Sequence, residues 1–242
     1  MKLLTVIPGF GGPDISLKRD CICITIQQIR DTYTGDIDVR IFCYGEETCG
    51  LEWEGVHVEE IVQKGCVGHF LYTYVTPTTV QPYDYVCIVL DDIEFQPDVH
   101  IDKCIALYNQ HNYDILSPSL TPSSKHSHTC MFSNGSQTIR TVAGMELFCY
   151  LLHKESYIRY VSVLDERSAW LWGIDLALDK LGFVCGILDC MTIQHWIKGE
   201  SYRADLPNPI QERDWNCTRF GLQEPDALRK LGMTKAIVYL EA

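Results

Sequence analysis

The chain has 242 residues, enough for one large domain with its own core and too few for two of ordinary size. Hydrophobic residues make up 46% and charged residues 21%, which is ordinary for a folded globular protein and argues against disorder. The net charge of −12 argues against a protein that binds nucleic acid or an anionic membrane surface, because both partners require a basic face.

Short apolar runs alternate with amphipathic stretches, which is typical of an α/β domain with a mostly parallel sheet. We predict strands at 3–7, 38–43, 56–60, 85–90 and 114–117, one within 141–151, one at 184–188, and a strand or loop at 191–196. We predict helices at 15–30, 62–75, 97–110, 173–181 and 226–231. The polar stretch 118–135 is rich in Ser, Thr and His and is predicted to be a long functional loop.

The 12 Cys residues fall mostly inside apolar runs, where Cys acts as a small buried hydrophobe, and no pair has C-x-x-C spacing. We therefore expect reduced thiols and a cytoplasmic location. The first 12 residues are too short an apolar run for a signal peptide or membrane anchor, and no stretch reaches transmembrane length.

Two adjacent carboxylates, Asp91 and Asp92, follow the predicted strand 85–90. In an open α/β sheet, ligands bind outside the carboxyl ends of the strands. Two carboxylates at such a point are tolerated if Mg²⁺ or Mn²⁺ lies between them and a ligand phosphate. The alternative is that both are solvated turn residues.

Three further segments carry candidate residues. Asp175, in Trp172-Gly173-Ile174-Asp175, stands at a predicted helix start, either as a cap or as a general base that the helix N-terminus keeps ionised. His195 and Lys198 could reach a metal and a phosphate, or could simply be surface residues. The glycines of Pro8-Gly9-Phe10-Gly11-Gly12 would let the backbone approach a nucleotide, although G-x-G-x-x-G is absent.

The chain order of these motifs resembles that of the GT-A glycosyltransferases, whose fold is a Rossmann-like three-layer sandwich with a mixed, mostly parallel central sheet. Over about residues 1–200 the sequence is also similar to an uncharacterised glycosyltransferase family of plants and bacteria, and in outline to small stand-alone enzymes of large algal viruses. The stretches that carry this resemblance are Phe42 to Gly45, Val62 to Leu71, Tyr83 to Asp92, Ser117 to Ser119, Met145 to Phe148, Trp172 to Asp175 and the segment around His195.

The resemblance implies one domain over 1–242, with a nucleotide-sugar-binding half at 1–115, an acceptor and catalytic half at 116–202 and a wrapping tail at 203–242. It implies a Mn²⁺ or Mg²⁺ site at Asp92 and His195, and Asp175 as the base of an inverting transfer from a nucleotide sugar, by default a UDP-sugar, to a glycan or glycoprotein. Glu146 and Trp172 would be weaker acceptor contacts. The implied donor contacts are Pro8, Gly9, Phe10, Gly11, Tyr44, Lys64, Asp91 and Lys198.

One position departs from the family pattern: the first acidic residue of Asp-x-Asp is Leu90 here. Either Asp91 takes over the ribose contact, or the metal is held by Asp92 and His195 alone; Glu94 could also pair with Asp92. Two other functions stay open, a sugar-phosphate nucleotidyltransferase and a non-catalytic nucleotide-sugar or carbohydrate-binding module. His126 and His128 allow a zinc site in the polar loop, although an acceptor-binding loop is favoured.

Overall fold

The computed structural model describes residues 1–45, 48–125, 129–197, 208–223, 231 and 233–240. Its strands are β1 (Lys2–Phe10), β2 (Asp36–Cys43), β3 (His57–Val62), β4 (Tyr85–Val89), β5 (Ile93–Phe95), β6 (Ile115–Leu120), β7 (Thr138–Val142), β8 (Cys149–His153), β9 (Cys185–His195) and β10 (Thr234–Tyr239). Its helices are α1 (Ile15–Thr32), α2 (Val67–Tyr74), α3 (Ile101–His111), α4 (Lys154–Val161), α5 (Ile174–Ala177) and α6 (Pro209–Arg219), with a 3-10 turn at Thr129–Met131.

All strands belong to one mixed sheet with the order β10-β7-β9-β6-β8-β4-β1-β2-β3, and β5 pairs with the end of β9. The N-terminal part, β4-β1-β2-β3, is parallel throughout. Beyond it, β8 runs antiparallel to β4 and β6, and β7 runs antiparallel to β9 and β10. Since β6 and β9 are parallel to each other, most strands point the same way, as predicted.

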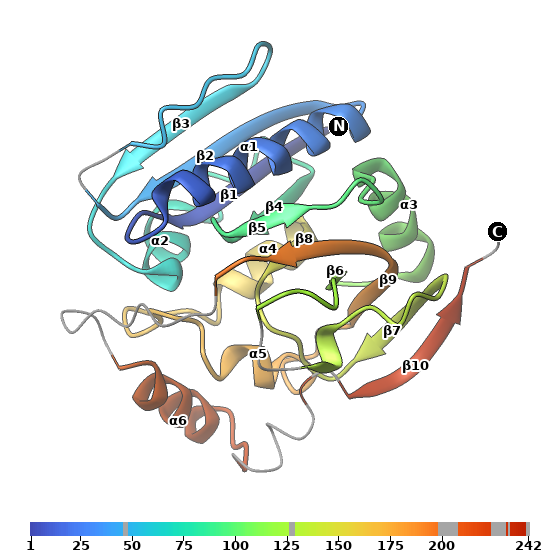
Figure 1. Ribbon diagram of the computed structural model, residues 1–242. Helices are drawn as coiled ribbons and strands as arrows, with labels where there is room; N and C mark the ends of the chain where they lie inside the picture. The colour runs from blue at the N-terminus through green and yellow to red at the C-terminus, as the bar shows by residue number, and fades with distance from the viewer. Residues whose placement is uncertain (46–47, 126–128, 198–207, 224–230, 232, 241–242) are drawn as a thin grey trace.

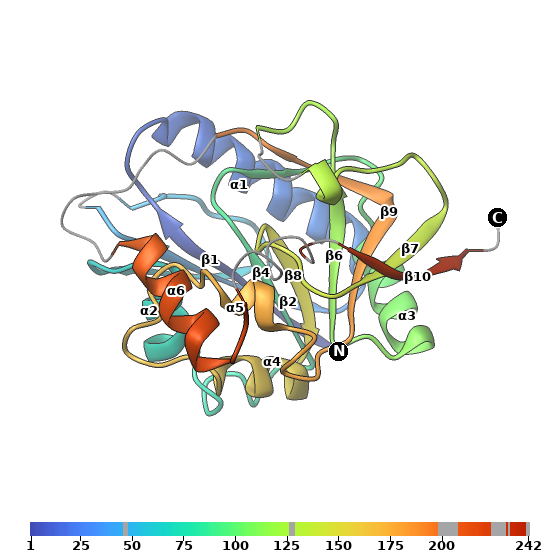
Figure 2. The same cartoon turned by 90° about the horizontal axis from the view of Figure 1, so that it is seen from below.

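Helices cover both faces of the sheet, which gives the expected three layers (Figures 1 and 2). On one face, α1 packs on β5 and contacts α3. On the other face, α2 packs on β1 and α4 on β8, and Tyr157 of α4 donates to the Val75 carbonyl at the end of α2. The helix α6 lies beside α5 (Figure 2).

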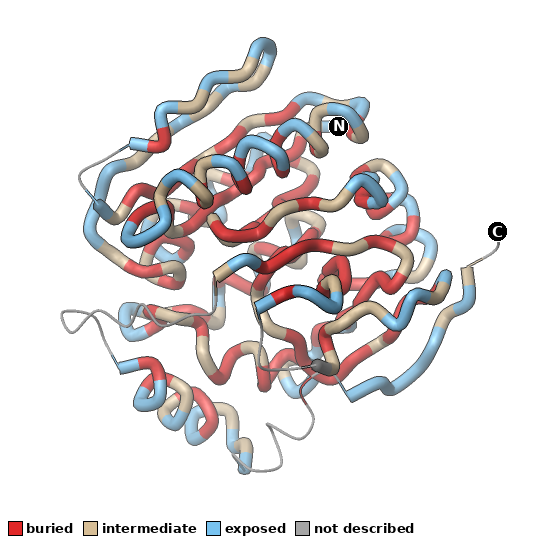
Figure 3. The backbone as a smooth tube through the Cα atoms, in the orientation of Figure 1, coloured by how far each residue is buried: buried red, intermediate tan, exposed pale blue. Residues whose placement is uncertain are grey.

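The core forms where the sequence alternates apolar runs with amphipathic helices. Every residue of β4 is buried, because that strand is covered on both faces (Figure 3). The buried residues of α1 recur at helical spacing: Lys18, Cys21, Ile22, Thr25, Ile26 and Ile29. All 12 Cys residues are free thiols, as expected. Among the described residues, no helix has both the length and the apolar character needed to cross a bilayer.

Several predicted ends of strands and helices differ from the structure. The strand β1 continues through Pro8 and Gly9 with a register shift instead of ending there. The segment 62–75 is helical only from Val67, because Val62 ends the strand β3. The predicted helix 97–110 begins only at Ile101. The predicted helix 173–181 is one turn, and the segments 184–188 and 191–196 form one strand, β9.

The sequence did not predict β5, α4, α6 or β10, and β7 and β8 were merged into one expected strand. The tail was expected to wrap with a single helix at 226–231, most of which lies outside the described residues. Instead, the described tail holds α6 at Pro209–Arg219 and adds β10 to the sheet edge.

Candidate active site

Several predicted residues meet where strands end at one edge of the sheet. The parallel strands β1, β2 and β4 end at Phe10, Cys43 and Val89, so their carboxyl ends lie together. The strand β9 follows the direction of β6 and ends at His195, whose backbone pairs with Ile93 just after the acidic pair. This is the edge at which α/β sheets bind ligands.

The glycine loop after β1 packs against the ring of Tyr44. The amide of Tyr44 donates to the Phe10 carbonyl at 3.1 Å. A Cβ added at Gly11 would lie 3.2 Å from the Tyr44 ring, and one at Gly12, where φ is +74°, would overlap the Tyr44 hydroxyl. Only glycine therefore lets the aromatic ring cover this loop.

A buried ion pair joins this loop to the acidic motif. The Lys18 ammonium lies 2.9 Å from a carboxylate oxygen of Asp91 and donates to the Gly11 carbonyl at 2.7 Å. Lys18 is 6% exposed, and its Nζ lies 5.9 Å from the centre of the Tyr44 ring. Asp91 was predicted to contact ribose or the donor sugar, and in the structure its carboxylate is the counter-ion of Lys18.

Burial works to lower the pKa of Lys18, but the nearby Asp91 carboxylate outweighs burial and raises it. Burial also raises the pKa of Asp91, against the pull of Lys18. The pair is best described as ionised, because a neutral Asp91 would leave a buried ammonium without its counter-charge.

Asp92 and His195 lie side by side, as a shared metal site requires. The Nε2 atom of His195 is 3.0 Å from a carboxylate oxygen of Asp92, and both residues are 8% exposed. The centre of the Phe148 ring lies 4.8 Å from the centre of the His195 ring, and the two rings are tilted by 47°. The strand ends are tied by a hydrogen bond of 3.1 Å from the Trp196 amide to the Asp92 carbonyl.

This donor set fits a divalent cation that also binds a substrate phosphate. Among the described residues, no three His, Cys, Asp or Glu side chains form a metal-binding group. Mg²⁺ and Mn²⁺ are commonly held by one or two protein ligands, with phosphate oxygens and water completing the shell. Asp92 and His195 therefore suit a metal that arrives with a diphosphate better than a metal held by protein alone.

The polar loop after β6 is anchored beside His195. The hydroxyl of Ser124 accepts from the His195 amide at 3.0 Å, and the Lys125 amide donates to the His195 carbonyl at 2.8 Å. Ser123 donates to the side chain of Gln194 at 2.7 Å. The near half of this loop is thus attached to the end of β9, whereas His126 and His128 lie outside the described residues.

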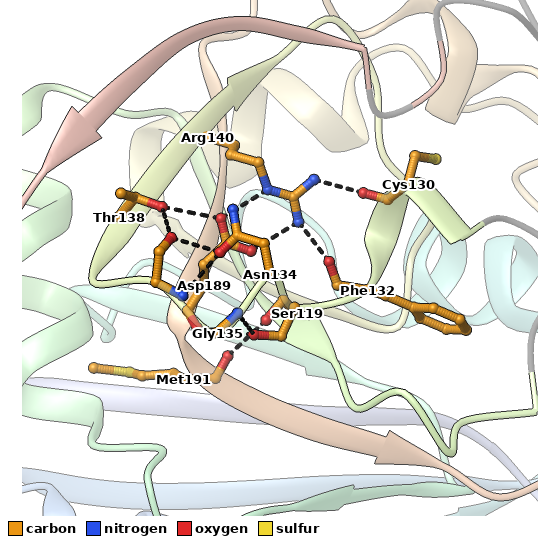
Figure 4. Close-up of polar contacts among 11 residues, drawn as sticks. Ser119, Cys130, Phe132, Asn134, Gly135, Thr138, Arg140, Asp189 and Met191 are labelled. Atoms are coloured by element: carbon orange, nitrogen blue, oxygen red, sulfur yellow. Dashed lines mark hydrogen bonds and ion pairs between the residues drawn. The ribbon is translucent and has the colours of Figure 1, made fainter.

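The far half of the loop is held by a buried ion pair (Figure 4). Arg140 makes two hydrogen bonds, of 2.8 and 2.9 Å, to the carboxylate of Asp189. Its guanidinium also donates to the carbonyls of Cys130 and Phe132, at 2.6 and 2.9 Å. Four hydrogen bonds from one side chain fix the loop to β7 and β9 and satisfy a charge that is only 8% exposed.

Asp175 lies at the first turn of α5, where its carboxylate accepts from the amides of Gly173 at 2.8 Å and Leu176 at 3.0 Å. Burial and the nearby Glu146 carboxylate raise its pKa to about 7, despite those hydrogen bonds. The helix N-terminus was expected to keep Asp175 ionised. Instead, α5 is a single turn, and burial dominates.

The remaining predicted residues differ in their surroundings. Pro8 and Phe10 are buried in β1, so the Phe10 side chain belongs to the core. Lys64 is exposed after β3, at the sheet edge. The Trp172 side chain is half-buried, and its carbonyl accepts from Asn216 at 2.8 Å. Lys198 lies outside the described residues.

Sequence reasoning missed Lys18 and the α6 residues Glu212 and Asn216. Lys18 carried a readable signal, because a lysine that falls on the apolar face of an amphipathic helix must find a partner. Glu212 and Asn216 carried none, since their contacts are to backbone groups about 40 residues earlier in the chain.

No protein-family model and no curated protein matches this chain. Among solved structures it is similar to GalNAc-T7, crystallised with UDP, GalNAc and Mn²⁺, with a TM-score of 0.62 and 10% identity over 94% of this chain. It is also similar to S. aureus TarS 1-349 in complex with UDP-GlcNAc, with a TM-score of 0.60 and 10% identity over 96% of this chain. The fold is GT-A. The alignments span 50% of the GalNAc-T7 chain and 70% of the TarS chain.

Proposed function

We propose that this protein is a glycosyltransferase that moves a sugar from a nucleotide-diphosphate donor, with UDP-sugars favoured, to a hydroxyl of a glycan or glycoprotein. The observation that carries the proposal is the pairing of Asp92 with His195 at the sheet edge, beside the glycine loop. Residues 103 positions apart in the sequence meet there in a ligand set suited to a metal diphosphate.

The donor would bind along the loop after β1. The Tyr44 ring and the Gly11 backbone would frame the base and ribose, and Lys18 would hold Asp91 in place through their ion pair of 2.9 Å. Lys64 and Lys198 stay proposed contacts of the donor phosphates. The net charge of −12 makes such local cations more important, because the overall field repels a nucleotide.

Asp92 and His195 would hold Mn²⁺ or Mg²⁺ against the diphosphate. When bound, such an ion supplies positive charge to the leaving phosphate oxygens. The Phe148 ring packs against the imidazole of His195, and the hydroxyl of Ser124 holds the backbone of His195 by accepting from its amide. The protein thereby provides an ordered pair of ligands before the donor arrives.

Asp175 would act as the general base of an inverting transfer. The acceptor oxygen would form a bond to the anomeric carbon as the bond from that carbon to the diphosphate oxygen breaks, and Asp175 would take the hydroxyl proton. A pKa of about 7 suits this role, since a base works best near the operating pH. Glu146 and Trp172 would lie on the acceptor side.

Two alternatives remain distinguishable. A sugar-phosphate nucleotidyltransferase would need a basic loop after β1, but the first cation of the sequence after β1 is Lys18 in α1, which is already engaged by Asp91 and Gly11. A binding module would keep the donor site and lack transfer. The similarity to GalNAc-T7 with UDP, GalNAc and Mn²⁺ and to TarS with UDP-GlcNAc supports a nucleotide-sugar donor. Free thiols throughout suit a reducing compartment such as the cytoplasm.

The test is release of UDP from a panel of UDP-sugars with Mn²⁺ and a mixture of glycan acceptors. Wild-type protein should release UDP with at least one sugar, and Asp175→Asn should lower the rate by about 100-fold or more. Donor binding without any release, equal in the variant, would identify a binding module. No binding of any nucleotide would refute the proposal.

A further inference from the structure

Side chains of the helix α6 form hydrogen bonds with the backbone of residues 169–172, the segment just before Asp175. The carboxylate of Glu212 accepts three consecutive amides, from Ala169 at 3.1 Å, Trp170 at 2.7 Å and Leu171 at 2.9 Å. One helical turn later, the Asn216 amide donates to the Trp172 carbonyl at 2.8 Å. Two side chains on one face of α6 thus hold four residues in a row.

The segment 169–173 has a backbone conformation that does not form readily on its own. Leu171 has φ +68°, a conformation that side chains other than glycine rarely adopt. Gly173 has φ +89°, and a Cβ there would lie 2.8 Å from the Cβ of Asn216. Such backbone persists only where surrounding contacts determine it, and α6 supplies four hydrogen bonds to this segment.

The segment connects directly to the proposed base. The amide of Gly173 donates to the Asp175 carboxylate at 2.8 Å, and Gly173 itself packs against α6. Both α6 side chains are buried where they meet the segment, since Glu212 is 5% exposed and Asn216 is 0% exposed. Burial raises the pKa of Glu212 to about 7, so the helix holds a costly buried carboxyl at this point.

We propose that Glu212 and Asn216 are positioning residues for the transfer reaction, and that α6 is a clamp which sets the orientation of Asp175. This inference rests on the proposed function of Asp175, but the clamp itself can be measured without activity. Loss of the clamp would leave the donor site intact, because the loop after β1, Asp92 and His195 are not among the α6 contacts described above.

The test compares Glu212→Gln and Asn216→Ala with a control on the same helix, Asp214→Asn. The Asp214 carboxylate is exposed and pairs with its neighbour Arg213. Glu212→Gln replaces one acceptor oxygen with an amide that faces backbone donors. Asn216→Ala removes only the hydrogen bond to the Trp172 carbonyl and keeps the three hydrogen bonds of Glu212. This milder variant tests the clamp if Glu212→Gln does not fold.

Hydrogen exchange of the amides at 169–173 is the readout that needs no activity. We expect it to accelerate about 10-fold or more in both clamp variants and not in the control. UDP binding with Mn²⁺ should stay unchanged, while kcat should fall by about 100-fold as the base is misplaced. The midpoint of the kcat–pH profile should move to higher pH, because the Gly173 hydrogen bond that favours ionised Asp175 weakens.

Unchanged exchange in folded variants, or a normal kcat with an unchanged pH profile, would overturn the clamp. If the wild-type protein transfers no sugar from any donor, the proposed function fails. The exchange measurement still decides whether α6 holds the segment, so the two failures are distinguishable.

Discussion

Asp175→Asn should stabilise the protein at high pH, which is the opposite of what loss of a structural cap would do. The folded-state pKa of Asp175 is about 7, above the ordinary value of 3.8. The folded protein therefore keeps a proton that the unfolded chain releases, and the free energy of unfolding falls as pH rises from about 4 to about 7. Asn keeps an oxygen that can accept from Gly173 and Leu176, and it carries no charge to bury.

The magnitude follows from the pKa. A rise from 3.8 to about 7 corresponds to an upper limit of about 4 kcal/mol, at about 1.36 kcal/mol per pKa unit. Asp175 retains partial exposure, so solvent screening reduces this, and we expect about 2 kcal/mol at pH 8. For a domain of this size, that raises Tm by about 4–8 °C.

Denaturant unfolding of wild type and Asp175→Asn at pH 4 and pH 8 measures the effect. The variant should be more stable at pH 8, and the difference should shrink toward zero at pH 4, where both side chains are neutral. A variant that is equally or less stable at pH 8, or a difference that is independent of pH, would refute the reasoning. Glu212 also has a pKa of about 7, but it is present in both proteins, so its contribution cancels in the difference between their unfolding free energies.

Two further substitutions test the donor side of the site. Lys18→Met should cost about 3–5 kcal/mol in chemical denaturation, because it leaves a buried carboxylate without its counter-charge, whereas Lys2→Met, at a more exposed pair, should cost about 1 kcal/mol or less; equal costs would contradict this. Gly12→Ala should weaken UDP binding about 10-fold by displacing the Tyr44 ring. The control is Gly50→Ala, also at positive φ, where an added Cβ would have no atom of the described residues within 4 Å, so this variant should cost only stability. Calorimetric titration measures both, and equal UDP binding by the two variants would contradict the prediction.

The sequence predicted best those elements of the N-terminal half that bury their own apolar run. The strand β4 and the helix α1 show the clearest patterns and were predicted to within two residues at each end. Prediction failed where tertiary contacts decide the structure. The segments 184–188 and 191–196 were predicted separately, yet Asp189 between them is buried within the single strand β9, where Arg140 neutralises it.

The candidate site was predicted in part for the same reason. Asp91 and Asp92 could be recognised in the sequence because they directly follow a buried strand. The pairing of Asp92 with His195 was predicted from the resemblance to GT-A enzymes, and the two side chains do meet. No local pattern indicates that a glutamate in the tail would hold the backbone before Asp175. The raised pKa of Asp175 could not be predicted from the sequence either, because it depends on burial, on the proximity of Glu146 and on the short length of α5, which only the folded structure shows.

Binding of UDP in the presence and absence of Mn²⁺ tests the central claim most directly, with wild type, Asp92→Ala and the exposed control Asp179→Ala compared by thermal unfolding. UDP with Mn²⁺ should stabilise the wild type and the control by about 2.7 kcal/mol at 100 times the Kd, and the Mn²⁺-dependent part should vanish in Asp92→Ala. No stabilisation by any nucleotide, or equal Mn²⁺-dependent stabilisation in Asp92→Ala, would contradict a metal-diphosphate site at Asp92 and His195.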